Sequence, residues 1–87
     1  MAEPKDLNLV ITEDRINSMD LETFYNVEGS VKATIDFVAH FVADEKEQYL
    51  DKKEAVLTVT RGRTIGDIGD IAQSLRDAME TKAVPKN

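Results

Sequence analysis

The stretch VKATIDFVAHFVA, residues 31–43, has the pattern of a helix that is apolar around most of its circumference. At about 100° per residue, two apolar stripes cover about 200° of the helix. One stripe contains Val31, Ile35, Val38, Ala39 and Val42, and the other contains Phe37 and Phe41. In a small domain, such a helix either lies centrally between its neighbours or offers its aromatic stripe to a partner.

We predict that a protein partner binds the aromatic stripe, Phe37 and Phe41, together with whichever of Phe24 and Tyr25 faces outward. Binding energy at interfaces is concentrated in a few aromatic residues ringed by polar ones, which supports this choice. The alternative, in which both phenylalanines are buried within the domain, stays open. Lys32, Asp36 and His40 share a polar wedge of the same helix, which we expect to face water.

The segments before residue 31 carry several helix-start signals. We expect residues 1–6 to be a flexible lead-in and residues 7–11, LNLVI, to be either extended or the start of a helix. Thr12 is a candidate N-cap, and Asp20 is a second one that opens LETFYNVE, which Gly29 should close. One bent helix and two short helices both fit this pattern.

The segments after residue 43 begin with a charged connection, DEKEQYLDKKE. Asp51 with Glu54 resembles a capping box, although the β-branched residues that follow leave residues 55–60 open to helix or strand. Gly62 should end that element. Residues 83–87 form a short tail in which Pro85 blocks further helix.

Residues 64–75, TIGDIGDIAQSL, open the last predicted helix, which Thr64 and Asp67 cap and which runs to about residue 81. Its apolar residues fall within one arc of about 140°. They are Ile65, Ile68, Ile71, Ala72, Leu75, Ala78 and Met79. A phosphate-binding loop is disfavoured, because Asp67 and Asp70 directly follow the two glycines, Gly66 and Gly69, and would repel an anion.

These patterns predict a mainly α fold, a small single-domain bundle of three to five helices over residues 7–82, with one short extended N-terminal segment as an option. The 31–43 helix should be central. The last helix should pack on it through Ile68, Ile71, Leu75 and Met79.

Composition restricts the function. The 87 residues include 11 basic and 17 acidic residues, a formal charge of −6, which disfavours nucleic acid and anionic membranes as partners. Cysteine is absent, and the one histidine, His40, has no convergent metal ligands or catalytic partners in the sequence pattern. We therefore expect no enzyme, no cofactor and no metal site. No apolar run approaches about 18 residues and the start lacks a signal-peptide pattern, so we expect a cytoplasmic protein.

The order of segments resembles that of the small tail assembly chaperones of long-tailed bacteriophages. The matching segments are LNLVITEDRI, SVKATIDFVAHFVADE, KEQYLDKKEAVLTV, TIGDIGDIAQSLRDAM and KAVPKN, of which HFVAD and AVP are the most specific parts. The glycines of TRGRTIGDIGD depart from the smoother helix expected of that family.

The resemblance implies a non-enzymatic helical protein that binds the tape measure protein during tail building, in the cytoplasm of a bacterial host, and is absent from the finished particle. It also implies a longer frameshifted form. The alternative is a small helical adaptor or structural subunit of a phage or bacterial assembly, which needs only the same amphipathic helices. A homo-oligomer is compatible with both.

Overall fold

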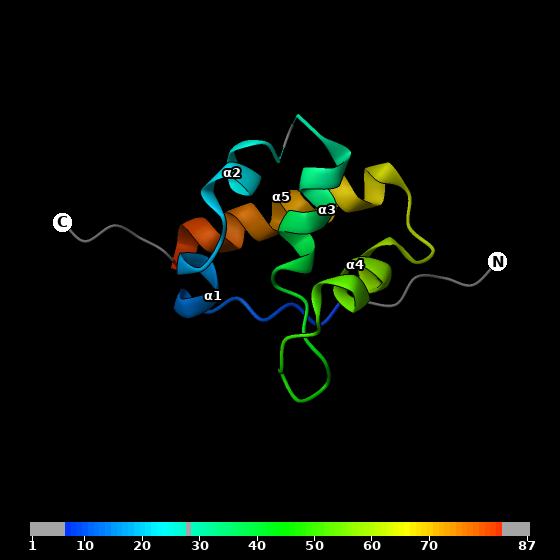
Figure 1. The fold of residues 1–87 in the computed structure, drawn as a ribbon. Helices are drawn as coiled ribbons and strands as arrows, with labels where there is room; N and C mark the ends of the chain where they lie inside the picture. The colour runs from blue at the N-terminus through cyan, green and yellow to red at the C-terminus, as the bar shows by residue number, and fades with distance from the viewer. Residues whose placement is uncertain (1–6, 28, 83–87) are drawn as a thin grey trace.

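The structure is a computed structural model that describes residues 7–27 and 29–82; the predictions for residues 1–6 and 83–87 lie outside this range. The described residues form five helices (Figure 1). They are α1 (Glu13–Asn17), α2 (Leu21–Tyr25), α3 (Val31–Ala39), α4 (Lys52–Thr60) and α5 (Ile65–Lys82). The predicted mainly α bundle is confirmed, and residues 55–60 are helix rather than strand.

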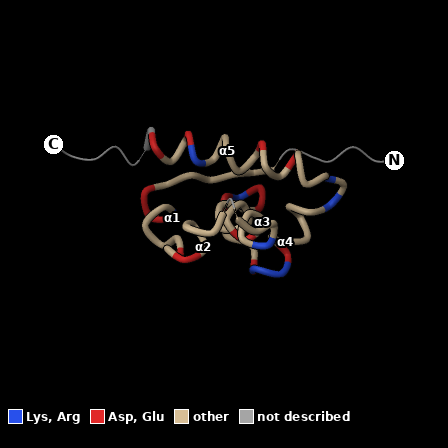
Figure 2. Tube along the Cα trace, turned by 90° about the horizontal axis from the view of Figure 1, so that it is seen from above, with Lys and Arg blue, Asp and Glu red and all other residues tan. Residues whose placement is uncertain are grey.

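Helix α3 is the centre of the bundle, since it contacts α2, α4 and α5. Seen from above, α5 runs along one side of the molecule and the other four helices lie on its other side (Figure 2). The predicted central position of this segment is therefore confirmed. No helix in the described part of the chain is both long and apolar enough to cross a lipid bilayer.

Every helix begins at a side chain that accepts a hydrogen bond from the backbone three residues later. These capping residues are Thr12, Asp20, Ser30, Asp51 and Thr64. The box at α5 is reciprocal, because Thr64 Oγ1 accepts from the Asp67 N–H at 3.1 Å and an Asp67 carboxylate oxygen accepts from the Thr64 N–H at 2.9 Å. These caps satisfy donors that a helix start leaves open.

The predicted 31–43 helix is too long by four residues, because α3 ends at Ala39. Beyond it the chain turns and pairs with the N-terminal segment through an antiparallel bridge between Leu9 and Val42. The N–H of Val10 donates to the Phe41 carbonyl oxygen at 2.9 Å. The N–H of Ala43 donates to the Asn8 carbonyl oxygen at 2.9 Å, whereas the N–H groups of Phe41 and Val42 still donate back to Val38 and Ala39 of α3. Residues 7–11 are not helical, and their pairing with the chain after α3 replaces the predicted last turn of the helix.

The region before α3 contains two short helices rather than one bent helix. Helix α2 ends at Tyr25, earlier than the predicted stop at Gly29. The side-chain amide of Asn26 donates to the Glu22 carbonyl at 2.9 Å, alongside the Asn26 backbone N–H at 3.1 Å. Such local side-chain bonds favour a helix end over continuation. The predicted stop of α4 at Gly62 is confirmed, with φ at 70°.

One apolar core joins α3, α4 and α5. Its buried members are Val27, Phe37, Val38, Ala39, Phe41, Val42, Ala55, Val59, Ile68, Ala72, Leu75 and Met79. The predicted packing face of α5 is confirmed, with Ile71 half-buried against this core. Ile65 is an exception, since 70% of it is exposed at the first turn of α5.

Candidate partner-binding groove

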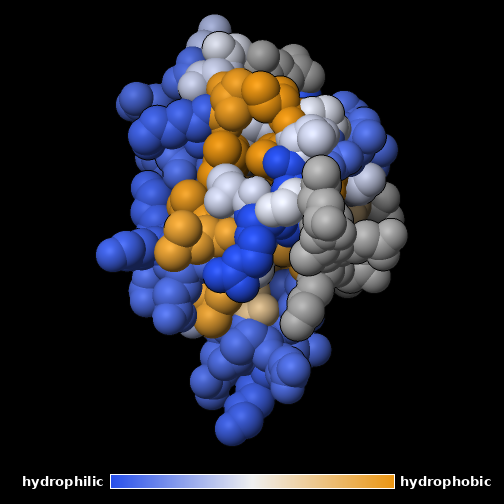
Figure 3. All heavy atoms as spheres, turned by 90° about the vertical axis from the view of Figure 1, so that its right-hand side faces the viewer, coloured by the Kyte–Doolittle hydropathy of each residue, from blue (hydrophilic) through white to orange (hydrophobic). Residues whose placement is uncertain are grey.

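A groove of about 370 Å³ lies between α5 and the start of α3. One wall consists of Val27, Gly29, Ser30, Val31 and Thr34, and the other of Ile65, Ile68, Gly69, Ala72, Gln73 and Arg76. Two large apolar residues of these walls remain open to solvent, Val31 at 46% and Ile65 at 70%. On the side where α5 begins, hydrophobic residues form a broken band bordered by hydrophilic ones (Figure 3).

The hydroxyl groups of the groove already have partners within the chain. Ser30 Oγ accepts from the Ala33 N–H at 3.3 Å, and Thr34 Oγ1 donates to the backbone carbonyls of Val27 and Ser30. Because these groups are satisfied, they add little to the recognition of a polar ligand. The groove therefore favours an apolar occupant.

At Gly69 the α5 wall has no side chain, so the groove is open at this point. A Cβ placed on Gly69 has no heavy atom within 4 Å, and one on Gly66 meets only Thr64 Oγ1, at 3.7 Å. Both glycines lie inside α5, so the helix predicted from this stretch is confirmed. Neither glycine is needed for packing within the fold, and the space at Gly69 is available to another molecule.

The predicted aromatic stripe does not lie on the surface, and the expectation that Phe37 and Phe41 face a partner is wrong. Both are 0% exposed. Their rings pack edge to face with centroids 5.8 Å apart, and the Phe24 ring packs on that of Phe37 with centroids 5.9 Å apart. The reason is the central place of α3, which contacts α2, α4 and α5 and is followed by the pairing with residues 7–11.

Of the adjacent aromatics, Tyr25 is the one that faces outward. It is 85% exposed, whereas Phe24 is partly buried against the core. Leu21, one turn earlier on α2, is 79% exposed. Residues four apart share a helix face, so Leu21 and Tyr25 form an exposed apolar pair outside the groove. Partner binding by Tyr25 stays a prediction.

His40 was expected to face water, and this expectation is wrong because the residue is half-buried and hydrogen-bonded. Its Nε2 lies 2.8 Å from the Arg15 carbonyl oxygen and 3.0 Å from Ser18 Oγ. A carbonyl oxygen only accepts, so Nε2 carries the hydrogen and cannot take a proton from Ser18. This Ser–His pair, which the sequence pattern did not indicate, therefore lacks the arrangement of a nucleophile with its general base.

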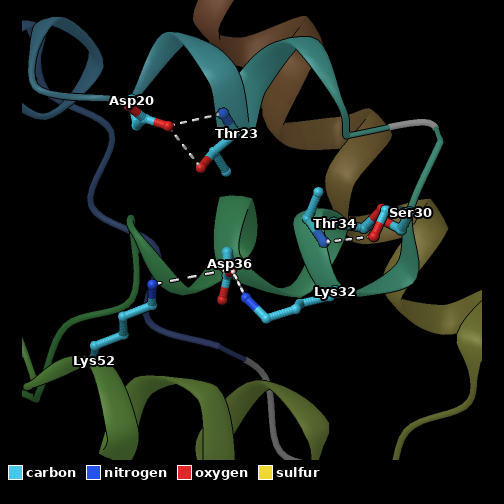
Figure 4. A network of polar contacts seen from close by, with 8 residues as sticks. Asp20, Thr23, Ser30, Lys32, Thr34, Asp36 and Lys52 are labelled. Carbon is cyan, nitrogen blue, oxygen red and sulfur yellow. Dashed lines mark hydrogen bonds and ion pairs between the residues drawn. The ribbon is translucent and has the colours of Figure 1, made fainter.

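A second cavity, of about 300 Å³, lies beside His40 and is more polar. Its charged members are Asp20, Asp36 and Lys52. Asp36 pairs with Lys32 at 3.1 Å, as the four-residue spacing predicts, and with Lys52 of α4 at 3.9 Å (Figure 4). Over residues 7–27 and 29–82, no three His, Cys, Asp or Glu side chains come together as metal ligands.

Arg15 is a feature that the sequence pattern did not reveal. It is the only charged side chain that is buried among those described, at 7% exposed. Its guanidinium donates to the carbonyl oxygens of Val10 at 3.4 Å, Phe41 at 3.4 Å and Glu47 at 2.9 Å. It also lies over the Tyr49 ring at 3.6 Å. One side chain thus joins three chain segments, and these satisfied donors make its burial tolerable.

Comparison of the chain with protein-family models, with curated proteins and with solved structures gave no match. The resemblance to tail assembly chaperones therefore stays a prediction based on the segments quoted above.

Proposed function

We propose that this chain is a non-enzymatic tail assembly chaperone that binds the tape measure protein while a phage tail is built. The observation that carries the proposal is the groove between α3 and α5, whose walls expose Val31 and Ile65 while its hydroxyl groups are satisfied internally. The order of segments that resembles this chaperone family supports the same function.

The physical task of such a chaperone is to cover apolar helical surface and keep the complex soluble. Burial of apolar surface contributes about 25 cal/mol per Å², so exposed side chains such as Val31 and Ile65 provide binding energy. The formal charge of −6 on this chain favours solubility, because copies of the chain repel one another. Neither task requires a catalytic group.

The direct test is co-expression with the tape measure protein encoded in the same genome. We expect the soluble fraction of the tape measure protein to rise and the two chains to elute together in size exclusion. Leu75→Asp, which buries a charge in the core, is the matched control for loss of the folded domain. A tape measure protein that stays equally insoluble with and without the folded chain contradicts the proposal.

A second candidate function is a structural adaptor, which the exposed pair Leu21 and Tyr25 favours because it offers apolar surface outside the groove. The two candidates differ in the fate of the protein. A chaperone leaves before the tail is complete, whereas an adaptor stays. Mass spectrometry of purified tails separates them, since the chain should be missing from finished particles if it is a chaperone.

A further inference from the structure

We propose that the groove between α3 and α5 binds one amphipathic helix with an apolar stripe flanked by basic residues. This inference rests on the proposed function only for the identity of the natural partner. The groove walls, the charges beside them and the open space at Gly69 carry it.

The length of the groove fits a helix. Its α5 wall runs from Ile65 to Arg76, about 17 Å at 1.5 Å per residue, or roughly three helical turns. Three turns present apolar anchors at i, i+3, i+4 and i+7, the pattern by which a helix fills an apolar groove. Gly69 and Ala72 lie midway along this wall, and the absence of a large side chain at these two positions lets a partner backbone approach closely there.

The charged residues beside the groove determine which charge the partner should carry next to its apolar stripe. With Ile65 at 0° on a helical wheel, Gly69 falls at about 40°, and Glu80, Asp77 and Asp70 follow between about 60° and 140°. All three acidic residues are exposed. Figure 2 shows acidic positions along the length of α5.

The one basic residue of the groove lining is Arg76, which lies at the far end with its guanidinium 6.0 Å from the centre of the Phe24 ring. Asp70 lies beside the α5 wall, and Asp77 and Glu80 continue the same face of the helix past its Arg76 end, so three acidic residues lie near this one basic residue. An acidic edge along an apolar groove attracts lysine and arginine beside the partner's apolar stripe. It also repels a second copy of this acidic chain, so a helix from a different protein is the fitting occupant.

The probe is a synthetic amphipathic helix with leucine at i, i+3, i+4 and i+7 and lysine on both flanks, compared with a peptide that has glutamate on the flanks. Titration into the isotope-labelled full chain should shift the amide resonances of the groove residues. The lysine peptide should bind at least about tenfold more tightly than the glutamate peptide at low salt.

Gly69→Leu is the blocking variant, since Gly69 lines the groove and a Cβ placed there meets no heavy atom within 4 Å. Gly66→Leu is the matched control, because Gly66 lies in the same helix but does not line the groove. We expect Gly69→Leu to weaken peptide binding at least about tenfold and Gly66→Leu to change it less than about twofold. Circular dichroism verifies that both variants are folded.

The acidic edge is tested with the double variant Asp70→Asn, Glu80→Gln. Binding of the lysine peptide should weaken about threefold to tenfold at low salt, and the difference should shrink as salt screens the charges. The double variant Glu45→Gln, Glu54→Gln removes two exposed charges outside α5 and should leave the affinity nearly unchanged.

Four results overturn the inference: no binding of the lysine peptide up to about 1 mM, equal binding by Gly69→Leu, equal affinity for both peptides, or a chain that dimerises through the groove. These outcomes are separable from those of the proposed function. If the tape measure protein binds and Gly69→Leu has no effect, the groove is wrong and the function stands. If the peptide binds in the groove and the tape measure protein does not, the groove stands and the natural partner is another protein.

Discussion

The two ends of α3 differ in how far the rest of the chain covers them. Beyond its C-terminal end, Phe41 and Val42 are buried, residues 7–11 pair with the chain, and the Arg15 guanidinium reaches the Phe41 carbonyl oxygen. At its N-terminal end, Val31 is 46% exposed and the groove separates α3 from α5. We refer to these as the closed end (residues 39–43) and the open end (residues 30–34).

The difference shows that apolar residues in one short stretch have two roles. At the closed end they stabilise the fold, because each makes contacts on all sides. At the open end the same residue types leave apolar area uncovered, and that area is available for binding. Substitutions at the two ends should therefore separate stability from binding.

The largest expected effect is that of Phe41→Ala at the closed end. The phenylalanine is 0% exposed, and its truncation should cost about 3 to 5 kcal/mol in the free energy of unfolding. A domain of this size has about 4 to 13 kcal/mol in total, so the variant should be marginally folded. Urea unfolding followed by circular dichroism measures the loss.

Val31→Ala is the matched open-end variant, and it should cost less than about 1 kcal/mol because nearly half of the side chain is in water. Equal losses for the two variants would show that the ends do not differ as described.

The next effect is that of Arg15→Met, which keeps an apolar side chain of similar length and removes the guanidinium. We expect a loss of about 2 to 4 kcal/mol, because hydrogen bonds to charged groups contribute about 1.5 to 3 kcal/mol and three carbonyls lose a bond to the guanidinium. The Phe41 carbonyl keeps its bond from the Val10 N–H. Urea unfolding measures it.

Arg15→Lys is the control for charge, since an ammonium group cannot present the planar fork that reaches three carbonyls. If Arg15→Lys is as stable as the unsubstituted chain, the positive charge rather than the geometry of the guanidinium stabilises the closed end.

A smaller effect is expected for Thr64→Ala at the start of the α5 wall. This change removes the hydroxyl that accepts from the Asp67 N–H, and loss of such a cap costs about 1 kcal/mol. Thermal unfolding should show the change, and Thr64→Ser should retain most of the stability. A Ser variant as unstable as Ala would mean that the threonine methyl group, not the cap, is responsible.

The smallest effect belongs to Lys32→Gln, on the polar side of α3. Lys32 is 83% exposed and pairs with Asp36 at 3.1 Å, and exposed pairs of this spacing contribute about 0.3 to 0.5 kcal/mol. The loss should disappear in high salt because the pair is screened. A loss above about 1 kcal/mol that persists in salt would contradict a surface role for the pair.

The helix starts and the packing face of α5 were predictable because their signals are local. A cap involves residues three apart, as at Asp51 and Glu54, and the apolar arc of α5 follows from helical periodicity. The length of α3 was not predictable from periodicity. Its apolar pattern continues to residue 43, but pairing with residues 7–11 takes over after Ala39.

The candidate site was less predictable, because it depends on which helices surround α3. The two aromatic residues Phe37 and Phe41 carry the same signal whether a neighbour in the chain or another protein covers them. The groove is lined by residues 27–34 and residues 65–76, and no local sequence pattern predicts that these two segments lie next to each other. Arg15 was missed for the same reason, since its carbonyl partners Phe41 and Glu47 lie 26 and 32 residues away.

The contacts of Arg15 have a consequence for the order in which the molecule unfolds. Helices α3, α4 and α5 supply most of the buried core, whereas residues 7–17 contain one buried residue, Arg15, and pack on the core through apolar side chains that are only partly buried. The bridge at Leu9 and the guanidinium of Arg15 add the polar contacts between this segment and residues 41–42. Segments with few buried contacts open at lower free energy than the global transition. Residues 7–17 should therefore exchange their amide hydrogens as one early-opening unit, while α3 and α5 exchange only when the whole domain unfolds.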